Sequence, residues 1–195
     1  MSALTQESMH LLEATVNLPQ KDAPFQLTGL KSNRLPDGDF GKTLVYVAGL
    51  GGSFQWASPF WKSLIEDGTL DAVIGIDLPS FGVNHHLQAG NLASCIEDLN
   101  RLCQLDTLKT ALSIQKMETC FFSGISLGAV TSLYVLPHVQ ADYEGIILFV
   151  PAFQGCQETY TPTYVASAMW QSVKQTLRKN PDALLTLPYT MDAIT

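Results

Sequence analysis

The chain has 195 residues, of which 46% are hydrophobic and 15% are charged. This length suits one domain or slightly more, and this apolar content is too high for a disordered chain. With 11 basic and 18 acidic residues the net charge is −7, which argues against a nucleic-acid groove and against a basic membrane-binding patch.

The sequence also lacks the marks of a membrane, secreted or metal-binding protein. No run approaches about 20 consecutive apolar residues, and residues 1–10 have neither the basic nor the apolar region of a signal peptide. The cysteines have no zinc-pair or redox-pair spacing; they are Cys95, Cys103, Cys120 and Cys156. Because Cys95, Cys103 and Cys120 lie among largely apolar neighbours, we expect reduced thiols in a cytoplasmic protein, with no metal and no cofactor.

The first predicted elements are a hairpin and a buried strand. Residues 10–18 and 25–30 form two short strands, and residues 36–39 form a turn. Residues 43–48 are a continuous apolar run that stops at a glycine-rich segment. A run that is apolar on both faces is typical of a central parallel strand covered by helices.

A helix is predicted after this strand. Ser58 is its expected N-cap, Pro59 fits its first turn, and Gly68 ends it. The second buried strand covers residues 72–76, and apolar residues then keep helical spacing from residue 92 to residue 103.

The same alternation continues to residue 150. A third strand covers residues 119–123, a helix runs from residue 127 to about Pro137, and a fourth strand covers residues 145–150. This order predicts an α/β fold with a mostly parallel sheet and helices on both faces. Residues 164–179 are predicted to form an amphipathic helix, and no further strand is expected after it.

A glycine-flanked serine lies where the third strand meets its helix. The segment Gly124-Ile125-Ser126-Leu127-Gly128 has the pattern of a nucleophile elbow. In such a turn the serine adopts a strained backbone conformation, and the two glycines remove side chains that would collide. We therefore predict that Ser126 is the catalytic nucleophile and that the Leu127 amide, at the helix N-terminus, stabilises an oxyanion.

A second glycine-rich turn follows the first central strand. Its sequence is Ala48-Gly49-Leu50-Gly51-Gly52, and glycines let the backbone approach a substrate closely. A second oxyanion-binding amide is expected at this position, and we predict that Leu50 provides it.

With the Asp-Leu-Pro-Ser-Phe-Gly turn at residues 77–82, these motifs resemble those of α/β-hydrolases. The chain is similar to the capped lysophospholipase, monoacylglycerol lipase and serine-aminopeptidase-like group over about residues 10–195, although Ala48 stands where that group usually has histidine. The resemblance implies esterase- or lipase-like hydrolysis of a small-molecule acyl substrate (an ester, thioester or amide) through an acyl-serine. It also implies that residues 1–153 are the N-terminal part of the hydrolase core and that residues 154–195 begin a cap.

The family places an acid and then a histidine after the nucleophile, and this chain does not supply them. His138 is the one histidine after Ser126, and twelve helical residues place it about 18 Å away. His85 and His86 precede the nucleophile in a loop. We therefore expect an N-terminal fragment or truncated gene product, with the acid and base beyond residue 195 and little activity of its own. Its last strand, residues 145–150, is then expected to be an unprotected sheet edge.

Two other functions remain open from the sequence. One is a non-catalytic α/β-hydrolase-like protein that binds a small ligand or a partner. The other is an acyltransferase of the same fold, because the access of water to an acyl-serine depends on the cap.

Overall fold

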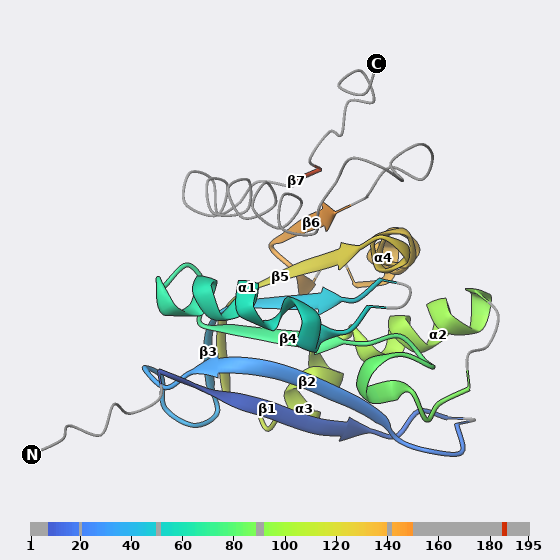
Figure 1. Cartoon of the computed structure of the whole chain (residues 1–195), viewed down its shortest axis with the longest axis horizontal. Coiled ribbons are helices and arrows are strands. Elements are labelled where there is room, and N and C mark those ends of the chain that lie inside the picture. The colour runs from blue at the N-terminus through green and yellow to red at the C-terminus, as the bar shows by residue number, and fades with distance from the viewer. Residues whose placement is uncertain are drawn as a thin grey trace, which may run out of the picture.

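The computed structural model describes residues 8–19, 21–49, 52–88, 92–139 and 142–149, together with a short strand at residues 185–186. Within these residues the strands form one seven-stranded sheet in the order β1-β2-β4-β3-β5-β6-β7 (Figure 1). The strands are β1 (Met9–Val16), β2 (Phe25–Ser32), β3 (Asp39–Val47), β4 (Ala72–Ile76), β5 (Lys116–Ile125), β6 (Gly145–Phe149) and β7 (Leu185–Thr186). From β4 to β7 all neighbours in the sheet are parallel, whereas β1 and β2 are antiparallel to each other and β2 is antiparallel to β4.

Helices cover both faces of this sheet, as the sequence predicted. They are α1 (Phe54–Glu66), the 3-10 helix η1 (Gly82–Asn84), α2 (Leu92–Leu102), α3 (Leu105–Ala111) and α4 (Leu127–Val139). Helix α1 packs on one face through Phe54, Trp61, Leu64 and Ile65. Helices α2, α3 and α4 pack on the other through Leu99, Leu102, Leu108, Val135 and Val139. None of the helices in the described ranges is long and apolar enough to cross a membrane.

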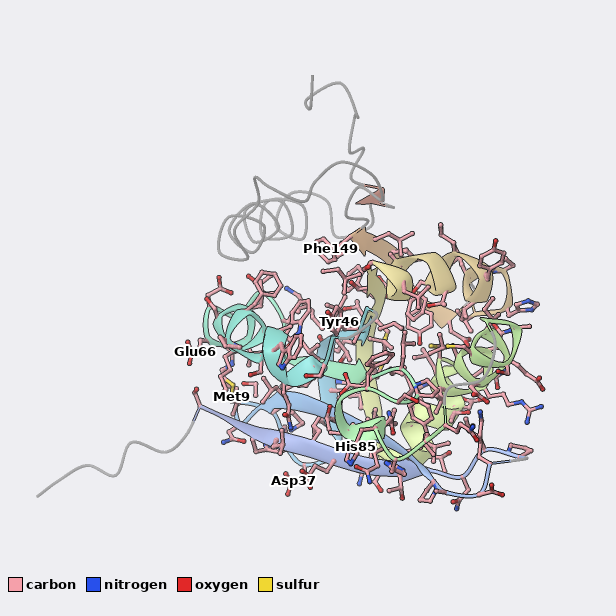
Figure 2. All side chains as sticks on the ribbon, turned by 45° about the vertical axis from the view of Figure 1, so that its right-hand side comes forward. Met9, Asp37, Tyr46, Glu66, His85 and Phe149 are labelled. Carbon is pink, nitrogen blue, oxygen red and sulfur yellow. The ribbon has the colours of Figure 1, made fainter. Side chains whose placement is uncertain are left out.

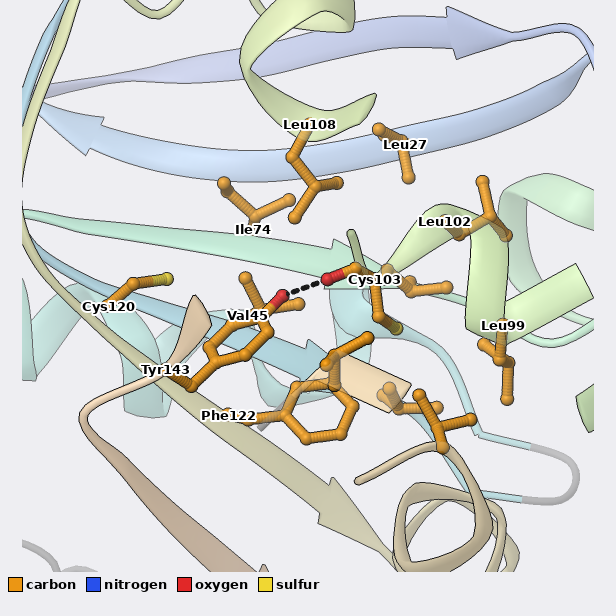
Figure 3. Close-up of a cluster of buried hydrophobic side chains, with 14 of the residues drawn as sticks. Leu27, Val45, Ile74, Leu99, Leu102, Cys103, Leu108, Cys120, Phe122 and Tyr143 are labelled. Atoms are coloured by element: carbon orange, nitrogen blue, oxygen red, sulfur yellow. Dashed lines mark hydrogen bonds between the residues drawn. The ribbon is translucent and has the colours of Figure 1, made fainter. Parts of the chain in front are cut away.

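The cluster beneath α2, α3 and α4 contains a buried tyrosine (Figure 3). The Tyr143 hydroxyl donates a hydrogen bond to the backbone carbonyl of Cys103, and the Tyr143 ring lies 5.1 Å from that of Phe122. Burial raises the pKa of the Cys103 and Cys120 thiols, so both stay protonated at neutral pH. The free cysteines among the described residues are Cys95, Cys103 and Cys120. Cys156 lies outside the described residues.

The start of α1 differs from the prediction. The helix begins at Phe54, with Ser53 as its N-cap, so Pro59 lies inside the helix and Ser58 is not its cap. Ser53 makes no side-chain capping bond; instead the Asp77 carboxylate accepts a hydrogen bond from the Phe54 N–H. A residue distant in sequence therefore sets where the helix starts, and no local capping pattern shows this.

Other boundaries move for reasons of pairing and packing. Strands β3 and β5 start earlier than predicted because they pair with each other from Asp39 and Lys116 onward. The predicted helix at residues 92–103 ends at Leu102, and a separate helix, α3, follows. Helix α4 continues through Pro137 to Val139, whose buried side chain anchors the last turn in the core.

The sheet also continues past residue 150. Strand β7 pairs in parallel with β6 through Ile147 with Leu185 and Leu148 with Thr186. The expectations that no strand follows residue 150 and that β6 is an unprotected edge were therefore wrong, because a strand of two residues, Leu185–Thr186, is too short for an alternating or apolar sequence pattern to reveal it. The helix predicted at residues 164–179 and the domain boundary after residue 153 lie outside the described residues.

Candidate active site

Ser126 occupies a sharp turn between the end of β5 and the start of α4. Its φ angle is 55°, in the left-handed region that costs a residue with a side chain about 1–2 kcal/mol. Two hydrogen bonds hold this conformation. The Ser126 N–H donates to the Phe149 carbonyl at the end of β6 (2.9 Å), and the Ser126 carbonyl accepts from the Ala129 N–H in α4 (3.1 Å). The hydroxyl-bearing residue is thus fixed between a strand and a helix.

The two flanking glycines allow α4 to begin close to the sheet. A Cβ on Gly124 would lie 2.5 Å from both the Gly128 carbonyl oxygen and the Ser132 hydroxyl. A Cβ on Gly128 would collide with the carbonyl oxygens of Val47 and Ala48 at the end of β3. The spacing of the motif is therefore a packing requirement at both positions.

The Leu127 amide lies at the beginning of α4. Leu127 is the first residue of the helix and is half-buried, like Ser126. The N–H groups of a first helical turn have no intrahelical acceptor and lie at the positive end of the helix dipole. This amide is therefore placed next to the Ser126 backbone with the polarity that an oxyanion requires, and its role as a donor remains a prediction.

Gly49, which opens the glycine-rich turn after β3, lies directly against Ser126. A Cβ on Gly49 would be 2.9 Å from the Ser126 Cβ and 2.9 Å from the Ile125 carbonyl oxygen. Within the turn, the Gly52 N–H donates to the Gly49 carbonyl (3.1 Å). The structure thus brings together the two motifs that the sequence singled out. Leu50 lies outside the described residues, so its predicted role as an amide donor stays a prediction.

A buried carboxylate holds the far end of this turn. Asp77 directly follows β4 and is fully buried. Its Oδ1 accepts from the Phe54 N–H (2.6 Å) and its Oδ2 accepts from the Val83 N–H (3.1 Å). Burial raises the pKa of Asp77 above the ordinary aspartate value, and these two hydrogen bonds lower it in part. Burial and the Asp77 charge also raise the pKa of the Tyr46 hydroxyl.

Sequence reasoning included Asp77 in a family-like turn and assigned it no function. The sequence signal for a role of Asp77 is an acidic residue at the end of a fully apolar strand. A carboxylate in that position needs buried hydrogen-bond donors, and so indicates that neighbouring backbone is bound to it.

Three of the four described histidines bond to other groups. His10 hydrogen-bonds to the Asn33 side chain (2.6 Å), and the His85 and His86 rings contact the carbonyls of Gly82 (3.0 Å) and Pro24 (3.2 Å). Figure 2 shows His85 well apart from Phe149, whose carbonyl holds Ser126. His138 is exposed in the last turn of α4. Among the described residues, no hydrogen bond joins a histidine to Ser126.

A hollow opens beside the glycine-rich turn. Its volume is about 420 Å³, and it is lined by Gln26, Gly52, Ser53, Gln55, Trp56, Gly82, Val83 and His85. The Trp56 side chain is 77% exposed at the start of α1. This surface combines an indole face with polar groups, next to the turn that contacts Ser126.

Solved structures with a similar fold include two esterases and a serine hydrolase. A thermostable carboxyl esterase from Bacillus coagulans matches with a TM-score of 0.53 and 14% identity, over 71% of this chain and 43% of that one. Brefeldin A esterase, a bacterial homologue of human hormone sensitive lipase, matches with a TM-score of 0.52 and 13% identity, over 94% of this chain and 57% of that one. A serine hydrolase without a lid from Xanthomonas campestris matches with a TM-score of 0.51 and 17% identity, over 77% of this chain and 67% of that one.

These similarities define the fold as that of an α/β-hydrolase. The chain spans less than half the length of the Bacillus coagulans enzyme. A family model described as serine aminopeptidase, S33 matches residues 39–193, and the chain therefore belongs to this family of α/β-hydrolases. A search of curated protein sequences finds no significant match. The family and fold expected from the sequence motifs are thus confirmed.

Proposed function

We propose that the protein is a serine hydrolase that cleaves an ester, thioester or amide through an acyl-serine on Ser126. The observation that carries this proposal is the backbone of Ser126, held at a φ of 55° at the start of α4 with the glycine-rich turn against it. A strained conformation at a residue with a side chain persists only where its surroundings enforce it, and such residues cluster at active sites.

The reaction follows from the groups around this turn. The Ser126 hydroxyl oxygen attacks the substrate carbonyl carbon while its proton passes to a general base. The negative charge that develops on the carbonyl oxygen is stabilised by the amides of Leu127 and Leu50. Collapse of this intermediate breaks the bond to the alcohol, thiol or amine, which leaves with the proton. Water then attacks the acyl-serine and releases the acid and free Ser126.

The general base and its acidic partner are expected outside the described residues. The rings of His10, His85 and His86 bind other groups, and both Asp77 oxygens accept backbone N–H groups. A serine hydroxyl without a base is a weak nucleophile at neutral pH. The sequence has one further histidine, His138, which is exposed in the last turn of α4, so we expect residues 1–195 alone to react on the order of 100-fold more slowly than a protein that contains the base.

Carboxylic esters are the substrates that this reasoning favours. Esterases recur among the structures that share the fold. The hollow beside the glycine-rich turn, with the exposed Trp56 ring, provides an apolar surface for an acyl or alcohol group.

The test is covalent labelling by a serine-directed fluorophosphonate. The protein, expressed from its full reading frame, should gain one adduct, located on Ser126 by peptide mass spectrometry. Ser126→Ala should abolish the adduct. Ser123→Ala is the matched control, because Ser123 is a buried β5 serine whose hydroxyl has no hydrogen-bond partner among the residues that the structure describes. The proposal is contradicted if the protein is not labelled, or if the adduct survives Ser126→Ala. Reversible, stoichiometric binding of an ester without turnover would indicate the non-catalytic alternative.

A further inference from the structure

We propose that Asp77 is a positioning residue for Ser126, acting through Ser53, Gly52 and Gly49, the described residues of the glycine-rich turn; this rests on the function proposed above. Asp77 does not contact the reacting hydroxyl. Its carboxylate fixes the far end of the turn whose near end packs against Ser126.

Two consecutive residues at the end of β4 hold the turn at both ends. Before the turn, the Ala48 N–H donates to the Ile76 carbonyl (3.0 Å). After the turn, the Phe54 N–H donates to Asp77 Oδ1 (2.6 Å). Between these two points, the Gly52 N–H donates to the Gly49 carbonyl (3.1 Å), so the described residues on the two sides of the turn are bonded directly to each other. A displacement of Phe54 is therefore passed through Ser53 and Gly52 to Gly49.

The near end of the turn meets Ser126 without free space. Gly49 approaches so closely that a Cβ there would be 2.9 Å from the Ser126 Cβ. Any movement of Gly49 therefore changes the space available to the Ser126 side chain. The hydroxyl must lie within a fraction of an ångström of its productive position for attack, and small misplacements cost large factors in rate.

No local group replaces Asp77 at the start of α1. Ser53 makes no side-chain cap, and the first turn of the helix contains no acidic residue. The Phe54 N–H is buried, so loss of the carboxylate leaves it without an acceptor. The capping of α1 and the anchoring of the turn thus depend on the same side chain.

Asp77 is itself held firmly. Its Oδ2 accepts from Val83, and its backbone carbonyl accepts from the Asn84 side-chain amide (2.9 Å). Asn84 is fully buried and also exchanges two hydrogen bonds with the Gln26 backbone in β2 (2.8 and 3.0 Å). Gly82 has a φ of +50°, and a Cβ there would collide with the Asp77 carboxylate. The loop after β4 is therefore built around this carboxylate.

The matched control lies at the other end of the same strand. Asp71 directly precedes β4, and its Oδ2 accepts from the Lys42 N–H of β3 (2.9 Å). It resembles Asp77 in bonding a backbone amide of the neighbouring chain segment. Asp71 lies at the N-terminal end of β4, whereas the turn packs against its C-terminal end. Asp71→Asn should therefore weaken the fold without displacing Ser126.

The experiment measures acylation of Ser126 and stability in parallel. In the protein from the full reading frame, Asp77→Asn should lower kcat, or the phosphonylation rate, about 10- to 100-fold while KM changes less than about 3-fold. Asp77→Ala should lower the rate further, because the asparagine retains one accepting oxygen. Asp71→Asn should leave the rate within 2-fold of the unaltered protein at a temperature where urea unfolding shows each variant to be folded.

Two results would overturn the inference. One is an equal rate in Asp77→Asn and Asp71→Asn. The other is a rate loss that only follows the unfolded fraction. If the variants do not fold, amide hydrogen exchange in the unaltered protein tests whether Asp77 anchors the start of α1. The Phe54 amide should exchange as slowly as the Ala48 amide. Rapid exchange of the Phe54 amide would contradict anchoring by Asp77. Absence of any Ser126 label in the unaltered protein would instead refute the proposed function.

Discussion

The substitution Gly124→Ala should destabilise the fold through a clash that can be worked out from the structure. The new methyl group would lie 2.5 Å from the Gly128 carbonyl oxygen and the Ser132 hydroxyl, whereas ordinary contacts lie at 3.4–4 Å. Relief requires α4 to move outward by about 1 Å, because the Gly128 atom is backbone. Overpacking of this kind costs about 1–3 kcal/mol. The Ser132 hydroxyl also donates to Gly128 (2.6 Å), and disturbing that bond adds about 1 kcal/mol.

Gly52→Ala provides the control. A Cβ there would meet the Gly49 carbonyl oxygen at 3.3 Å, which needs only a slight adjustment. Both changes stiffen the unfolded chain equally, by about 0.4–1 kcal/mol, so this effect cancels in the comparison. Urea unfolding followed by tryptophan fluorescence should therefore show Gly124→Ala less stable than Gly52→Ala by about 2–4 kcal/mol. A difference below about 0.5 kcal/mol would refute the packing argument for the elbow.

Three further predictions concern the core and pH. Trp61→Ala should cost about 3–5 kcal/mol, because the ring is 1% exposed, whereas Trp56→Ala at an exposed site should cost under about 0.5 kcal/mol. Tyr143→Phe should cost about 1–2 kcal/mol, because the Cys103 carbonyl loses its buried donor. Burial raises the Asp77 pKa above its ordinary 3.8, so the folded state binds this proton more tightly than the unfolded chain does. The contribution of this proton to the free energy of unfolding is complete below pH 3.8, the pKa of an ordinary aspartate, and is lost as pH rises through the Asp77 pKa of the folded state.

Each of these has a direct measurement. Urea unfolding at pH 7 gives the free energies of the tryptophan and tyrosine variants, and equal losses for Trp61→Ala and Trp56→Ala would contradict the packing of α1. For Asp77, the reference is Asp77→Asn, which does not titrate. The unfolding free energy of the unaltered protein, minus that of Asp77→Asn, should fall as pH rises above about 4. A difference that rises with pH would show that hydrogen bonding, and not burial, dominates the Asp77 pKa.

Local patterns in the sequence determined the order of elements and the position of the serine turn. The strands β4 and β6 and the helix α4 were predicted because apolar runs and helical spacing are properties of neighbouring residues. The elbow was predicted for the same reason, since Gly124, Ser126 and Gly128 lie within five positions of one another. The motif does not show which distant residues pack against the elbow, such as the Val47 and Ala48 carbonyls against Gly128.

Tertiary contacts decided the rest. The start of α1, five residues earlier than the predicted cap Ser58 suggested, is set by Asp77, which is 23 positions from Phe54. The packing of Gly49 against Ser126 joins turns from two separate strands, and β7 extends the sheet by pairing across a long stretch of chain. Capping by a distant carboxylate, close approach of backbones and strand pairing all depend on which segments the fold makes neighbours. Sequence periodicity shows which residues are buried, and only the folded chain shows which residues they pack against.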